Sequence, residues 1–96
     1  MNKATFMKRY PDFDWKAASA GVKQAIRFCE ESLLDSMLSG KRIFPCGYGG
    51  KGKNTRCIGS RYYYVDIAKA LGYETVVGND APKGGHWGQW VEIKPA

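Results

Sequence analysis

A glycine-rich, strongly basic segment in the middle of the chain most constrains what this sequence can fold into. Four of the six residues from 47 to 52 are glycine, and this density disfavours both helix and strand. The wider segment, residues 41–61, holds six Lys or Arg residues and no Asp or Glu, a charge of +6 that equals the formal net charge of the whole protein. The regular elements of the fold must therefore lie mainly before and after this segment.

The chain before the basic segment has the pattern of a long amphipathic helix. Over residues 15–38 the apolar side chains recur at helical spacing, in a stripe made of Trp15, Ala18, Val22, Ile26, Cys29, Leu33 and Met37. Asp12 or Asp14 is expected to cap this helix, and Gly40 to end it. Gly21 weakens the helix and is the expected point of any division into two pieces.

Two other segments lie in the first two thirds of the chain, one at the N-terminus and one after the predicted helix. Residues 1–11 are expected to form an N-terminal arm. The basic segment is expected to be a hairpin, in which residues 41–46 lead in, residues 55–58 are the returning strand and the glycine-rich run is a long basic tip.

The chain after the basic segment predicts a helix followed by a β-hairpin. Residues 60–71 place apolar side chains on one helical face, with Ser60 as the N-cap and Gly72 as the C-terminal glycine. The strand propensity of residues 62–65 predicts that this helix starts a few residues late. The predicted first strand, turn and second strand are residues 75–77, 79–85 and 86–93.

Together these elements predict a single small α+β domain over residues 1–96. An alternative is a winged-helix-like arrangement, with residues 60–71 as recognition helix and residues 82–85 as the tip of the wing. No apolar run approaches the roughly 20 residues of a membrane span, and the N-terminus lacks the apolar core of a signal peptide. Three cysteines without framework spacing fit a reducing compartment, so we expect a cytoplasmic protein.

The glycine-rich run also matches the letters of a phosphate-binding loop. Residues 47–53 satisfy the pattern G-x-x-x-x-G-K, in which backbone amides wrap phosphates and the lysine neutralises them. Asn54, however, replaces the Ser or Thr that would hold magnesium, and residues 55–59 favour a strand and turn instead of a helix. The chain is also short for the parallel sheet around such a loop, and we expect no nucleotide hydrolysis.

The ligand types of a structural zinc site are present without the usual spacing. Cys29, Cys46, Cys57 and His86 make a Cys3His set, but ten residues separate Cys46 from Cys57. His86 is the only histidine, and no acid–base partner lies near it in the sequence. Nothing favours a Cys–His nucleophilic pair, and we predict no metal, no cofactor and no enzymatic activity.

The segregated charge predicts a nucleic-acid-binding module. Lys and Arg neutralise phosphates, glycines allow close approach of the backbone, and the neighbouring tyrosines would stack on unpaired bases. The C-terminal hairpin would add a second contact. The candidate residues are Lys41, Arg42, Tyr48, Lys51, Lys53, Arg56, Arg61 and Lys83.

A protein partner is the alternative function. A short basic chain without a cofactor motif also suits a small phage-type inhibitor or adaptor that docks on a nucleic-acid enzyme or a host-defence complex. His86, Trp87 and Trp90 would then contact the partner, since exposed tryptophans are frequent interface hot spots. Such an inhibitor binds its target without nucleic acid, which distinguishes the two hypotheses. The choice of DNA or RNA, any sequence preference and the oligomeric state stay open.

Overall fold

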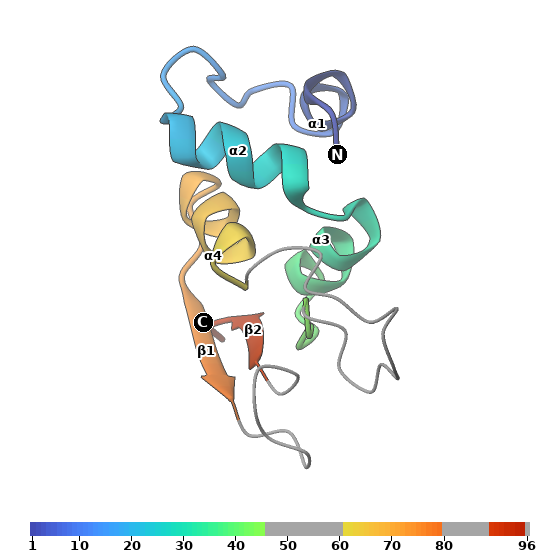
Figure 1. The fold of residues 1–96 in the computed structure, drawn as a ribbon, viewed down its shortest axis with the longest axis vertical. Helices are drawn as coiled ribbons and strands as arrows, with labels where there is room; N and C mark the ends of the chain where they lie inside the picture. Colours follow the sequence, from blue (N-terminus) through green and yellow to red (C-terminus); the bar gives the residue numbers. More distant parts are fainter. Residues whose placement is uncertain (46–60, 80–88, 96) are drawn as a thin grey trace.

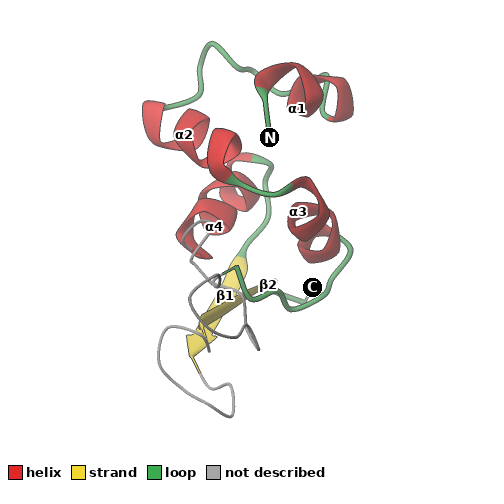
Figure 2. Cartoon of the chain, turned by 45° about the vertical axis from the view of Figure 1, so that its right-hand side comes forward, coloured by secondary structure: helices red, strands yellow, loops and turns green. Residues whose placement is uncertain are grey.

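The computed structural model describes residues 1–45, 61–79 and 89–95, and these form a small α+β fold (Figure 1). The described helices are α1 (Lys3–Arg9), α2 (Ala20–Phe28), α3 (Glu31–Leu38) and α4 (Arg61–Ala70). The strands are β1 (Thr75–Asn79) and β2 (Gln89–Ile93), paired as an antiparallel hairpin. The helices lie together at one end of the molecule and the strands at the other (Figure 2). The predicted α+β class and C-terminal hairpin are confirmed, but β1 extends to Asn79, which the sequence had placed in the turn.

The long helix predicted over residues 15–38 is two helices, so its continuity is wrong. α2 ends at Phe28, and the next two residues, Cys29 and Glu30, are extended with ψ angles of 157° and 133°. The Glu30 amide donates a hydrogen bond to the hydroxyl of Tyr64 on α4, at 2.9 Å. This tertiary bond satisfies the Glu30 amide at the break between α2 and α3. The chain changes direction there, and apolar residues of the stripe on both sides of the break still reach the core.

The start of α2 also differs from the prediction. Ser19 is the N-cap in place of Asp12 or Asp14, and its hydroxyl accepts from the Val22 amide at 3.2 Å. Asp14 instead accepts from a backbone amide in the turn before the helix. Gly21 lies in the first turn of α2, far from the break between α2 and α3.

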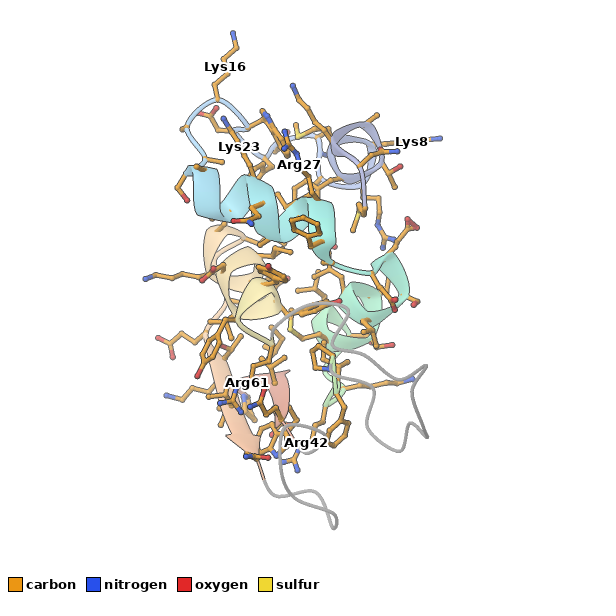
Figure 3. The ribbon with its side chains drawn as sticks, in the orientation of Figure 1. Lys8, Lys16, Lys23, Arg27, Arg42 and Arg61 are labelled. Carbon is orange, nitrogen blue, oxygen red and sulfur yellow. The ribbon has the colours of Figure 1, made fainter. Side chains whose placement is uncertain are left out.

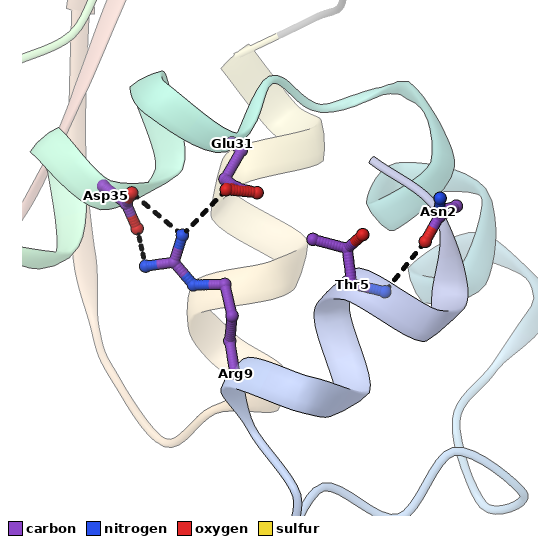
Figure 4. Close-up of polar contacts among 5 residues, drawn as sticks. All are labelled: Asn2, Thr5, Arg9, Glu31 and Asp35. Atoms are coloured by element: carbon purple, nitrogen blue, oxygen red, sulfur yellow. Dashed lines mark hydrogen bonds and ion pairs between the residues drawn. The ribbon is translucent and has the colours of Figure 1, made fainter.

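Residues 1–11, expected as an arm, contain the helix α1. Asn2 caps it, with its side-chain oxygen accepting from the Thr5 amide at 2.8 Å (Figure 4). Phe6 is fully buried, and its ring packs against that of Tyr10 with the centroids 5.0 Å apart. The aromatic face of α1 therefore belongs to the core.

Charged groups tie α1 to the neighbouring helices. The guanidinium of Arg9 donates two hydrogen bonds to Asp35 of α3 and forms an ion pair with Glu31 at 3.3 Å (Figure 4). The N-terminal ammonium of Met1 donates to three carbonyl oxygens at the C-terminal end of α2. A positive charge at that end complements the helix dipole.

α4 begins at Arg61, so the predicted delay in its start is wrong. The tyrosine run is helical because Tyr64, 1% exposed, packs into the core and overrides its strand propensity. Gly72 follows the helix with a φ of +93°, the left-handed conformation expected of a C-terminal glycine, and Gly40 does the same after α3.

The hairpin brings three segments of the chain together. Val77 of β1 lies opposite Val91 of β2, and Ile43 forms an isolated bridge to Val91 on the other edge of β2. The Ile43 bridge exchanges two backbone hydrogen bonds of 3.0 and 3.1 Å. The tip and the returning strand of the predicted basic hairpin lie outside the described residues, and the described Ile43 pairs with β2.

The core lies between the helices and the inner face of the hairpin. Among the described residues it consists of Phe6, Ala25, Ile26, Cys29, Leu34, Met37, Ile43, Tyr64, Ile67, Ala68 and Val91. Side chains from all four described helices and from β2 therefore share one cluster. None of the described helices has the length and hydropathy needed to cross a membrane.

Candidate nucleic-acid interface

The structure describes three of the eight residues predicted to contact nucleic acid. Lys41 and Arg42 are exposed, and Arg61 is half-buried at the start of α4. The other candidates, and two residues predicted for a protein partner, lie outside the described ranges: Tyr48, Lys51, Lys53, Arg56, Lys83, His86 and Trp87. The third predicted partner residue, Trp90, is described.

Arg42 is fixed on the hairpin by an aromatic and an acidic side chain. Its guanidinium carbon lies 3.6 Å from the centroid of the Trp90 ring, and it donates to a carboxylate oxygen of Glu92 at 3.1 Å. Trp90 itself is only 7% exposed. The structure therefore covers the indole that the sequence had suggested as an exposed contact for a protein partner.

The Trp90 ring occupies the space left by the absence of a side chain at Gly78. The two residues are directly opposite in the antiparallel ladder. A β-carbon at Gly78 would stand 2.2 Å from atom Cζ2 of the ring, closer than any real contact. The absence of a side chain at this position is therefore what allows the indole to fold across β1.

Arg61 reaches the same strand from α4. Its Nη1 donates to the carbonyl oxygen of Gly78 at 2.6 Å, and its guanidinium carbon lies 5.1 Å from the centroid of the Tyr62 ring. Its Nε is buried without a hydrogen-bond partner among the described residues. Since Arg42 and Arg61 both contact the hairpin, the basic segment 41–61 is attached to the same sheet near each of its ends (Figure 3).

A second group of cations, which the sequence analysis did not single out, lies on α1, α2 and the loop between them. Lys8, Lys16, Lys23 and Arg27 occupy the end of the molecule opposite Arg42 and Arg61 (Figure 3). The ammonium groups of Lys3 and Lys23 lie 5.2 and 5.8 Å from the Trp15 ring centroid.

This second group has a signal in the sequence. Residues 3–27 hold six Lys or Arg residues and only two carboxylates, Asp12 and Asp14. Glu31 and Asp35 follow on α3, where Arg9 engages them. The excess of positive charge therefore belongs to α1, α2 and the loop between them.

Two aromatic rings from different helices stack at the surface. The rings of Phe28 on α2 and Tyr63 on α4 have centroids 5.9 Å apart and planes inclined by 23°. Phe28 is 53% exposed, as is the neighbouring Tyr62. The first turn of α4 therefore places exposed aromatic surface directly beside Arg61.

The described cysteine has the surroundings of a core residue. Cys29 is 3% exposed, and its thiol donates to the carbonyl oxygen of Ile26 at 3.2 Å. Burial raises the pKa of the Cys29 thiol, which keeps it protonated and unreactive. Within the described ranges, His, Cys, Asp and Glu side chains form no group of three that could hold a metal ion.

The candidate interface thus comprises the basic segment attached to the hairpin, the cations of α1 and α2, and the exposed aromatic rings of α2 and α4. Comparison with protein-family models, with curated proteins and with solved structures finds no match to this chain. What the protein does must be inferred from its own charges and contacts.

Proposed function

We propose that this protein binds nucleic acid, gripping the phosphates with the basic segment 41–61. The observation that carries the proposal is the segregation of charge: six cations and no carboxylate within one segment of a chain whose remaining residues carry no net charge. A positive field confined in this way is the electrostatic footprint of a polyanion-binding protein. The residues assigned to phosphate contact are Lys41, Lys51, Lys53 and Arg56, with Lys83 as a second contact.

Arg42 and Arg61 have a different role in this proposal. Arg42 stacks on Trp90 and pairs with Glu92, and Arg61 donates to the Gly78 carbonyl. Guanidinium groups with such contacts hold the backbone of the segment on the hairpin more than they supply charge to a ligand.

The cations of α1 and α2 support the same proposal. They lie at the end of the molecule opposite Arg42 and Arg61 (Figure 3). We therefore expect a long polyanion to be able to contact both groups of cations.

A winged-helix-like docking, with α4 as the recognition helix, is a finer form of the proposal. α4 is followed directly by the hairpin, and Ile43 bridges to β2 on the edge away from β1. The exposed positions of α4 include Tyr62, Asp66 and Lys69. A carboxylate beside a single lysine is poorly suited to enter a groove lined by phosphates, so we favour contact through the loops and the exposed rings.

A titration by fluorescence anisotropy tests the proposal. Labelled single-stranded and double-stranded DNA and RNA of about 20 nucleotides are each titrated at about 50 and about 200 mM salt. We expect binding at the lower salt and a steep loss of affinity at the higher one. No binding of any of the four at the lower salt would overturn the proposal.

Docking on a protein remains the second candidate, because the outer edge of β1 carries exposed apolar residues. Val76 and Val77 of β1 are 38% and 39% exposed, and Tyr73, two residues before the strand, is 45% exposed. The backbone groups of Val91 bond to Ile43, so those of its partner Val77 point to the unpaired edge of the described sheet. An added strand from a partner would bind there. Retention of a target from nuclease-treated lysate, abolished by Val77→Pro, would favour this candidate.

A further inference from the structure

We infer that the stacked pair Phe28–Tyr63 is a platform for unpaired bases, and that the nucleic acid bound is therefore single-stranded. This inference rests on the proposed function and specifies its ligand. It concerns a surface made by α2 and α4, separate from the basic segment that grips the phosphates.

The first support is the geometry of the two rings. Phe28 and Tyr63 lie nearly parallel, with centroids 5.9 Å apart. Phe28 keeps 53% of its surface in water although Ala25, one turn before it, is fully buried. A half-exposed phenyl ring already stacked on its inner side offers its remaining surface to another flat ring, and bases bind proteins in this way.

The second support is the position of the rings among cations. Arg27 is exposed and immediately precedes Phe28 on α2, and it forms no ion pair within the described part of the chain. Arg61 stands two residues before Tyr63 on α4, but its guanidinium is held by the Gly78 carbonyl. A base on the platform would therefore have the guanidinium of Arg27 beside it to meet a flanking phosphate.

The platform should distinguish single-stranded from double-stranded nucleic acid. In a duplex the faces of the bases are stacked on one another, so a surface ring reaches them only at an end or after unstacking, which costs a few kcal/mol per step. In a single strand the faces are accessible, and every base has one. The platform therefore predicts a preference for single strands that is tolerant of sequence.

The test compares two single strands of equal charge, one with and one without bases, and adds a duplex. A labelled oligothymidylate of about 20 nucleotides, an abasic oligomer of the same length and a duplex of the same length are titrated by anisotropy. The variant is Phe28→Leu, which keeps an apolar side chain of similar size and removes the flat ring. Phe28→Trp restores a ring, and Tyr73→Ala is the matched control, because Tyr73 is another exposed aromatic, 45% exposed, outside the platform.

We expect the wild type to bind oligothymidylate about tenfold more tightly than the abasic oligomer. Phe28→Leu should lose this advantage and keep the salt dependence, while Phe28→Trp and Tyr73→Ala should retain it. Equal affinity of wild type and Phe28→Leu for oligothymidylate, or equal affinity of the wild type for the two single-stranded oligomers, would overturn the inference. If the abasic oligomer and the duplex still bind with a steep salt dependence, the proposed function survives; if nothing binds, both fail.

Discussion

The indole ring of Trp90 lies across Gly78 of the neighbouring strand, so closely that a β-carbon at Gly78 would be 2.2 Å from the ring. The same ring contacts the guanidinium of Arg42 at 3.6 Å from its centroid. One buried aromatic side chain thus joins β1, β2 and the N-terminal end of the basic segment. The position of that segment depends on this packing.

Gly78→Ala should therefore destabilise the fold by about 1–3 kcal/mol, the usual cost of overpacking, because the indole must leave its place. Urea unfolding followed by circular dichroism measures this. Gly21→Ala is the matched control: its β-carbon would meet nothing nearer than the Ser19 hydroxyl at 3.8 Å, and alanine in a helix should stabilise by about 0.5–1 kcal/mol. Equal unfolding midpoints for the two variants would refute the assigned contact.

Tyr64→Phe should lower stability by about 1–2 kcal/mol. The change removes the hydroxyl that accepts the Glu30 amide at 2.9 Å, and the amide is left without this partner at the break between α2 and α3. Tyr63→Phe is the control, since it removes a hydroxyl from the adjacent, half-exposed residue. If both variants unfold at the same urea concentration, the bond does not stabilise the break.

The same tyrosine predicts a loss of stability at high pH. Burial raises the pKa of Tyr64 to about 12, from an ordinary value of 10.0. Below pH 10 the hydroxyl is protonated in both the folded and the unfolded chain, and its contribution is complete. As the pH rises from 10 towards 12 the unfolded chain loses the proton first, so stability falls by up to about 1.4 kcal/mol per pH unit.

Urea titrations of wild type and Tyr64→Phe at several pH values measure this effect. The difference in stability between the two proteins should shrink above pH 10, because only the wild type carries this ionisation. All other ionisable groups are common to both proteins and cancel in the comparison. A constant difference across this range would show that Tyr64 titrates as an ordinary phenol.

Cys29 should resist thiol reagents in the folded protein. It is 3% exposed, and burial raises the pKa of its thiol. In a Cys46→Ser, Cys57→Ser background, we expect at least a tenfold slower reaction with a disulfide reagent in buffer than in denaturing urea. Equal rates in the two solutions would mean that the α2 end of the core is open.

The sequence predicted the elements that local rules decide. Gly40 and Gly72 follow α3 and α4 as predicted, and the alternation of residues 90–93 predicted the strand β2. The apolar stripe of residues 15–38 predicted one helix, which the structure begins only at Ala20 and divides into α2 and α3. The break at Cys29 and Glu30 could not be read locally, because it depends on the hydroxyl of Tyr64, more than 30 residues away. The helix α1 was missed for a related reason: its buried Phe6 becomes informative only once the other helices surround it.

The sequence predicted the charge of the candidate site better than it predicted the geometry of that site. Lys41, Arg42 and Arg61 were found from charge alone, but the sequence did not show that both arginines contact the hairpin. The Phe28–Tyr63 pair joins residues of two different helices, and no pattern in the sequence pairs them. Composition and periodicity carry no information on contacts between residues that are far apart in the sequence.

The most direct test of the account compares two charge-matched double variants in the anisotropy assay. Lys51→Ala with Lys53→Ala removes two cations from the basic segment, and Lys69→Ala with Lys94→Ala removes two exposed cations elsewhere. We predict that the first pair weakens binding and lowers the slope of log affinity against log salt by about 1.4–1.8, the value for two lost phosphate contacts. The second pair should leave that slope unchanged. Equal slopes for both double variants would show that residues 41–61 do not grip the phosphates.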